Sequence, residues 1–211
     1  TVWNGSVDTD WNTAANWTPS GVPLASAHIQ ISTTNDCALD QSRSCASLTI
    51  DSGATLIGGG YKLTVTSEGD AASGTEGFAV NNDGIISGNL DLEINTTTAT
   101  DIDLAGTSGN FQNLKLNDVS CDVTMKADCI LDGTLIIAAG QLSTGTGGYG
   151  FSNLTVAGNC TVSAGATLEG NASSGATVRL YSLTVNGTYS ATGGETIITG
   201  ETGAGRAVEW F

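Results

Sequence analysis

The sequence predicts an all-β fold, a parallel and right-handed β-helix (solenoid) with a tryptophan-rich cap at its N-terminus. Three observations predict it. Short phrases of alternating apolar and polar residues recur along the chain and end at glycine. Glycine accounts for 29 of the 211 residues and proline for 2, a mixture that suits many tight turns. No stretch of helical length carries the apolar stripe of an amphipathic helix.

An x-Leu-x-apolar phrase is the most frequent of these units. It occurs at Ser47–Ile50, Lys62–Val65, Asp91–Ile94, Asn113–Leu116, Asn153–Val156 and Ser182–Val185. A unit this short cannot bury its own apolar side, so successive units have to stack along an axis. Uneven spacing of the phrases predicts coils of variable length. Their leucines are expected to line one interior, among them Leu48, Leu114, Leu154 and Leu183.

The segment from Ser152 to Gly170 shows the pattern most clearly. It contains three successive phrases, each with apolar or β-branched residues at alternate positions. Because each phrase is followed by a turn residue, the segment predicts three very short strands with turns between them.

Residues 1–31 differ from the rest and are predicted to form the cap and the first strand. Three of the four tryptophans lie here, at Trp3, Trp11 and Trp17, together with both prolines. An open solenoid end exposes apolar core and unpaired strand edges, which large flat side chains can cover. Residues 32–211 are predicted to form the solenoid body, in one continuous domain with the cap.

This opening resembles that of large β-solenoid surface proteins of bacteria, autotransporter-like passengers among them, and of structural proteins of marine tailed phages. The residues that carry the resemblance are Trp3, Gly5, Trp11, Asn16, Trp17, Gly21, Pro23, Ile29 and Ile31. The resemblance covers about the first 30 residues by motif and the remainder only by style. It implies a solenoid fold and an exposed setting, and it brings no catalytic residue with it.

The charge balance excludes some classes of partner. The chain has 21 acidic and 6 basic residues, a net charge of -15. Such a charge repels nucleic acid and anionic membrane surfaces, so neither is expected as a partner. No apolar run has the length of a membrane span, and no membrane insertion is expected. A surface rich in Ser, Thr, Asn and Gly is typical of proteins at an extracellular or virion surface.

The five cysteines leave at least one thiol without a partner in the chain. Cys37 and Cys45 are eight residues apart, and a disulfide between them is one interpretation. Cys121 and Cys129 have the same spacing, but they belong to an alternating run from Val119 to Leu131 that puts both sulfurs on a buried face. That run is too long for one strand, which predicts a corner near Lys126 to Asp128.

The polar residues form no convincing catalytic or metal-binding set, so no catalytic residue, metal or cofactor is expected. The sole histidine, His28, has no nucleophile in a recognisable motif context. A zinc site needs more Cys-x-x-Cys or histidine ligands than the chain offers. Four acidic residues are expected on one solvated strand face, opposite Leu92, Ile94, Ile102 and Leu104: Asp91, Glu93, Asp101 and Asp103. They do not form a calcium loop.

Aromatic residues supply the remaining candidate sites. Trp11, Trp17 and Tyr149 could stack on sugar rings or form an interface. Trp3 and the aromatic pair Trp210 and Phe211 are candidate interface residues.

These observations favour a non-enzymatic structural or decoration protein at an extracellular or virion surface, such as a component of a phage capsid or fibre. It would act as a homo-oligomer or docked on a larger protein assembly. One alternative is a bacterial surface adhesin or carbohydrate-binding module that takes a glycan. A polysaccharide lyase or depolymerase is another. A jelly-roll sandwich is the alternative fold, since it also uses short strands and frequent turns.

Overall fold

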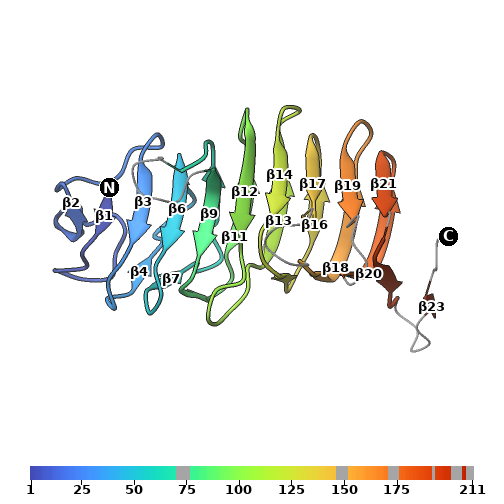
Figure 1. Ribbon diagram of the computed structural model, residues 1–211. Helices are drawn as coiled ribbons and strands as arrows, with labels where there is room; N and C mark the ends of the chain where they lie inside the picture. Colours follow the sequence, from blue (N-terminus) through green and yellow to red (C-terminus); the bar gives the residue numbers. More distant parts are fainter. Residues whose placement is uncertain (70–76, 146–151, 171–175, 192, 201–205, 208–211) are drawn as a thin grey trace.

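Parallel strands stacked along one axis form nearly the whole structure, a computed structural model that describes residues 1–69, 77–145, 152–170, 176–191, 193–200 and 206–207. Figure 1 shows the strands side by side, from the N-terminus at one end of the stack to the C-terminus at the other. The predicted β-solenoid is confirmed. Because the strands of successive coils pair in parallel, the antiparallel jelly-roll alternative is wrong.

The strands form three faces. The first face contains β1 (Val2–Trp3), β2 (Trp17–Thr18), β3 (His28–Ile31), β6 (Ser47–Ile50), β9 (Phe78–Asn82), β12 (Ala99–Asp103), β14 (Asp122–Met125), β17 (Gln141–Ser143), β19 (Thr167–Gly170) and β21 (Thr188–Ala191). The second contains β4 (Cys37–Ala38), β7 (Thr55–Ile57) and β10 (Ile85–Ser87). The third begins with β5 (Arg43–Cys45), β8 (Lys62–Val65), β11 (Asp91–Ile94), β13 (Asn113–Leu116) and β16 (Leu135–Ile137).

Later coils join the second and third faces through long strands. These are β18 (Leu154–Val162) and β20 (Thr177–Val185), which pair with β15 (Cys129–Leu131), β16 and β22 (Glu195–Ile198). In β18, Leu154 to Val156 pair with β15, and Cys160 to Val162 pair with β16. A last short strand, β23 (Arg206–Ala207), pairs antiparallel with β22.

The segment Ser152 to Gly170 therefore contains two strands and not the predicted three. Its first two phrases run on as β18, with a shift in register between Val156 and Asn159, and its third phrase is β19. The N–H of Gly158 donates to the carbonyl oxygen of Gly133 in the preceding coil, 2.7 Å away. A Cβ at Gly158 would lie 2.6 Å from that oxygen, which is too close. Because glycine has no Cβ, the strand can bend at this corner and keep its backbone hydrogen bonds to the preceding coil.

The leucines of the repeated phrases line one interior, as predicted, but on different faces. Leu48, Leu114 and Leu154 are fully buried, and Leu183 is partly buried against the same core. The third face stacks a column in register: Leu63, Leu92, Leu114, Leu135, Cys160 and Leu183. Leu48 belongs to the first face, where it pairs with Ile29 and Val80. The phrase thus marks an inward-facing strand and not a fixed place in the coil.

All five cysteines are free and buried, so the interpretation of a Cys37–Cys45 disulfide is wrong. These two residues lie on β4 and β5, strands of two different faces, where each acts as a small apolar core residue. Cys121 and Cys129 are buried as predicted, and the predicted corner separates β14 from β15. Val119 does not belong to the buried run: it is 81% exposed because the strand begins only at Asp122.

Stability is expected to fall as the pH rises above about 9, because the buried thiols resist ionisation. Burial raises the pKa of Cys45, Cys129 and Cys160 from 9.0 to about 12. Above pH 9 the thiols of the unfolded chain lose their protons, whereas those of the folded chain keep them. The free energy of unfolding therefore falls, by about 1 kcal/mol for each thiol at pH 10. Urea titrations between pH 7 and 10 measure the decline. Cys129→Val should make it shallower, and an identical decline in that variant would contradict this explanation.

Candidate functional site

The N-terminal end of the solenoid is closed by three tryptophans. β1 pairs in parallel with β3 and antiparallel with β2, so the chain folds back across the end of the first face. Trp3, Trp11 and Trp17 are each at most 1% exposed. The ring of Trp17 meets the rings of Trp3 and Trp11 edge to face, with centroids 4.9 and 4.7 Å apart. This end is therefore a small core with packed aromatic rings.

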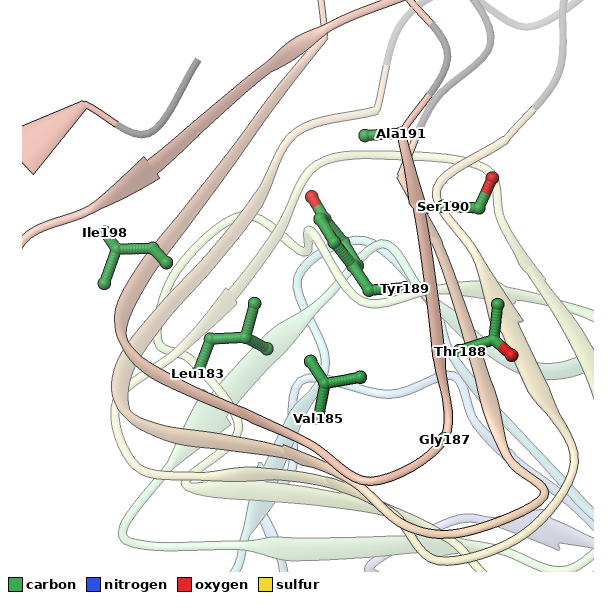
Figure 2. A pocket seen from close by; sticks show the side chains of 8 residues that line it. All are labelled: Leu183, Val185, Gly187, Thr188, Tyr189, Ser190, Ala191 and Ile198. Atoms are coloured by element: carbon green, nitrogen blue, oxygen red, sulfur yellow. The ribbon is translucent and has the colours of Figure 1, made fainter. Parts of the chain in front are cut away.

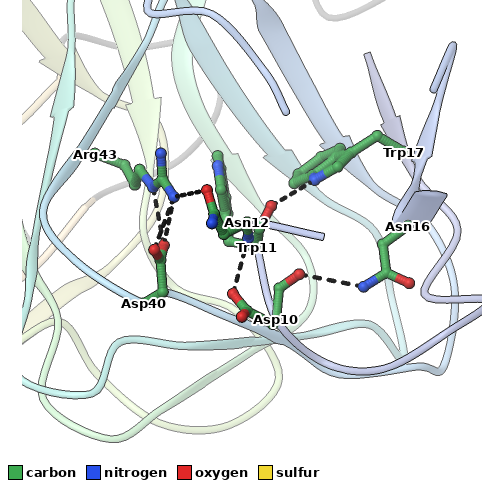
Figure 3. A network of polar contacts seen from close by, with 7 residues as sticks. All are labelled: Asp10, Trp11, Asn12, Asn16, Trp17, Asp40 and Arg43. Carbon is green, nitrogen blue, oxygen red and sulfur yellow. Dashed lines mark hydrogen bonds and ion pairs between the residues drawn. The ribbon is translucent and has the colours of Figure 1, made fainter. Parts of the chain in front are cut away.

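A polar network holds this cap to the first coil (Figure 3). The indole N–H of Trp17 donates to the carbonyl oxygen of Trp11 at 2.8 Å. Arg43 of β5 connects the solenoid body to the cap: it forms an ion pair with Asp40 at 2.7 Å and donates to the side chain of Asn12 in the cap at 3.0 Å. The cap is thus fastened to the solenoid by a charged group that remains only partly buried.

Polar groups in the turn of the cap form hydrogen bonds with side chains of the same turn. Asp8 accepts hydrogen bonds from the backbone N–H of Asp10, from the side-chain amide of Asn16 and from the hydroxyl of Thr13. The backbone hydrogen bond is the main reason why the pKa of Asp8 is lowered. Asp8 and Asp10 remain exposed, so the outer side of the cap carries negative charge.

Burial of the tryptophans overturns the sugar-stacking prediction for Trp11 and Trp17, because neither ring has an open face. It also removes Trp3 as an interface residue, since its indole N–H is satisfied within the chain by the carbonyl oxygen of Asn35 at 2.9 Å. The other predicted aromatic candidates, Tyr149, Trp210 and Phe211, lie outside the described residues.

The four acidic residues predicted to share a strand face are divided between two faces, and that prediction is wrong. Asp91 and Glu93 lie on β11 of the third face, whereas Asp101 and Asp103 lie on β12 of the first. The chain turns a corner between them, which sequence alternation cannot show.

Nearby lysines pair with two of these carboxylates. Glu93 is 2.9 Å from Lys62 and 3.9 Å from Lys115, its neighbours in adjacent coils, and Asp101 is 3.1 Å from Lys126. Burial raises the pKa of Asp103, with a further contribution from nearby Asp83. Within the described part of the chain, no group of three or more His, Cys, Asp or Glu side chains could hold a metal ion.

His28 has a serine partner that sequence reasoning missed. Its Nδ1 lies 2.9 Å from the hydroxyl oxygen of Ser47, because β3 and β6 pair these two residues in register. Ser47 is only 4% exposed, so its hydroxyl is covered. The pair therefore links two neighbouring coils. A search for cross-strand neighbours at one-coil spacing could have found it.

The far end of the solenoid carries an open groove of about 820 Å³. Its lining comes from the last coils: Leu183, Val185, Gly187, Thr188, Tyr189, Ser190, Ala191 and Ile198. Figure 2 shows that Leu183, Val185 and Tyr189 point into the space between the faces. None of the lining residues is charged, and most of the groove surface is apolar.

The strands around this groove keep free edges. Among the described residues, β21 pairs only with β19, and Ser182 to Val185 of β20 pair only with β18. The neighbouring edge of β22 is covered by β23. The hydroxyl of Tyr189 is hydrogen-bonded to that of Thr196, which fixes the ring across the opening. An apolar groove beside unpaired strand edges is suited to binding another polypeptide.

Comparison with known protein families gives a match to the first part of the chain. A family model described as a domain of unknown function (DUF8693) matches residues 2–125, which is more than half of the chain. The match covers the cap and the coils as far as β14, and it stops before the groove. No curated protein and no solved structure matches. The described residues contain no helix with the length and apolarity needed to cross a bilayer.

Proposed function

Because this chain belongs to the family described as a domain of unknown function (DUF8693), its role has to be inferred from its own geometry, and we propose that it is a non-enzymatic structural protein of an extracellular or virion-surface assembly. It serves there as a decoration or fibre component. The observation that supports this role most is the difference between the two ends: a packed cap at one, and at the other an apolar groove beside strand edges that have no partner strand among the described residues.

The mechanical part of the proposal depends on ladders that join every coil to the next. On the first face, backbone pairing runs without interruption from β3 through β6, β9, β12, β14, β17 and β19 to β21. Pulling one coil away requires breaking ladders on several faces together, while the apolar columns inside keep water out. An elongated body of this kind suits a spacer or a surface element.

Side-chain ladders strengthen the corners. Asn113 donates to Asp91 of the preceding coil at 2.7 Å and accepts from the backbone N–H of Thr134 of the next coil, also at 2.7 Å. Asn153 has the equivalent position in another column: its side-chain amide donates to Asp128 of the preceding coil and accepts from the backbone N–H of Thr177 of the next. Each amide thus joins three successive coils. Such cross-links resist unravelling because a side-chain amide offers both donors and an acceptor.

A sugar-binding role has little support in the described residues. The tryptophans that would bind pyranose rings are buried, and the groove at the open end has no charged group to orient an acidic glycan. Proteins that cleave acidic polysaccharides need converging carboxylates and bases. The four carboxylates predicted to lie together are instead divided between two faces.

Immunogold electron microscopy tests the proposed setting. Antibodies raised against the purified chain are applied to intact virions and extracellular structures from the source, and to thin sections of the cells. Gold is expected on the outer surface of an assembled particle. Label confined to the cell interior would contradict the proposal, as would turnover of an acidic polysaccharide by the purified chain. Pre-immune serum on the same grids is the control.

A further inference from the structure

We infer that Asn186, at the corner between β20 and β21, is a site of covalent modification by deamidation, and that the fold directs this reaction to Asn186 and away from Asn4. The reaction converts the side-chain amide to a carboxylate, with water as its only co-reactant. This chemistry is separate from the proposed function, because it depends on the corner and not on where the protein assembles.

Asparagine is chemically labile, above all when glycine follows it, since glycine has no Cβ to hinder its backbone nitrogen. That nitrogen attacks Cγ of the asparagine and forms a C–N bond, and the side-chain nitrogen leaves as ammonia with the proton that the attacking nitrogen loses. Water then opens the cyclic imide at one of its two carbonyl carbons. One opening gives aspartate, and the other gives isoaspartate, whose main chain is one methylene longer.

The chain has two such pairs, Asn4–Gly5 and Asn186–Gly187, and their backbones make matching hydrogen bonds. In the first pair, the carbonyl oxygen of Asn16 accepts from the asparagine N–H at 2.7 Å and from the glycine N–H at 3.3 Å. In the second, the carbonyl oxygen of Val162 accepts from the same two groups at 2.8 and 3.2 Å. These backbone hydrogen bonds give no reason for the two pairs to react at different rates.

The side chains of the two asparagines differ. The amide of Asn4 is held at both ends, because its Oδ1 accepts from the backbone N–H of Ser6 at 2.9 Å and its Nδ2 donates to the hydroxyl of Thr18 at 3.1 Å. Asn186 is exposed, and no group among the described residues is hydrogen-bonded to its amide. Two hydrogen bonds must therefore open before Asn4 can react, which slows it by about tenfold relative to Asn186.

The corner has no room for a longer main chain. Figure 2 shows Gly187 at the turn, on the side of the coil away from Ile198. A Cβ at Gly187 would lie 2.2 Å from the carbonyl oxygen of Ser163 and 2.3 Å from that of Ala166. Isoaspartate adds a methylene directly before this contact, so we expect it to displace β21 from β19. Aspartate keeps the backbone and adds only a negative charge.

Peptide mapping by mass spectrometry tests the inference on the folded chain, incubated in mildly alkaline buffer and sampled over time. Both sites are measured in the same samples, so Asn4 is an internal control. Asn186 is expected to convert about tenfold faster than Asn4. In urea, where neither side chain is held, the two sites should convert at similar rates. Circular dichroism checks that the sampled chain remains folded.

Thr18→Val tests the reason for the difference. It removes the hydroxyl that holds the amide of Asn4, and Thr18 is exposed on β2. Conversion of Asn4 in the folded chain should rise by about threefold, with Asn186 unchanged.

Hydrogen exchange gives a second readout. The aged wild-type chain should lose protection in β21, whereas Asn186→Gln, which cannot form this imide readily, should keep it.

Absence of conversion at Asn186 in the folded chain would overturn the inference, as would equal rates at the two sites. A tenfold difference that persisted in urea would also contradict it, because the difference would then lie in the neighbouring sequence and not in the fold. An unchanged rate at Asn4 in Thr18→Val would show that its hydrogen bonds do not protect it.

Discussion

Replacing Trp17 by alanine is expected to lower the free energy of unfolding by about 3 to 5 kcal/mol, the usual cost of removing a buried tryptophan. Its ring is 1% exposed and contacts both other tryptophans of the cap, and its indole N–H satisfies the carbonyl oxygen of Trp11. The substitution would leave a cavity in the cap, between the rings of Trp3 and Trp11. Urea unfolding followed by circular dichroism measures the change.

Val7→Ala is the matched control for this experiment, because Val7 belongs to the same cap but is 63% exposed. Its effect should stay within about 0.5 kcal/mol, as for other exposed positions. If Trp17→Ala were equally mild, the cap would not be a packed core. The sugar-binding interpretation of this tryptophan would then regain support.

Replacing Gly140 by alanine is expected to cost about 3 kcal/mol or more, through two additive effects. The backbone of Gly140 has φ +77°, which L-residues with a side chain rarely adopt. Its Cβ would also lie 2.2 Å from the carbonyl oxygen of Cys121 and 2.6 Å from that of Asp118. Cys121 cannot retreat easily, because its carbonyl oxygen accepts the backbone hydrogen bond of Gln141.

Gly165 separates the two effects. It has φ +80° one coil further on, but a Cβ there would have no atom within 4 Å. Gly165→Ala should therefore show the backbone cost alone, about 1 to 2 kcal/mol. Urea unfolding of both variants gives the difference. Equal effects of the two substitutions would mean that close stacking of neighbouring coils does not restrict Gly140.

Much of the fold could be predicted because the constraints are local. Alternation in phrases such as Asn113–Leu116 specifies which side chains face inward, and frequent glycine specifies where the chain turns. Since no such phrase can bury its apolar side alone, stacking followed from the same pattern. The burial of Cys121 and Cys129, and the corner between them, could be predicted for this reason.

The candidate site could be predicted far less well, because it depends on which residues of different coils become neighbours. Trp11 and Trp17 have the composition of a sugar platform, and only packing against Trp3 and the first coil shows that they are core. Ser47 meets His28 across 19 residues of sequence, through strand register.

The sequence by itself therefore determined the strand class, the inward-facing residues and the acidic, turn-rich surface, since these depend on composition and on a two-residue period. Only the tertiary structure decided which face each phrase occupies, which cysteines stay apart and which residues pack together in the cap. The physical reason is that coil length varies, so neighbours along the axis are set by backbone register between coils, a relation that no local pattern contains.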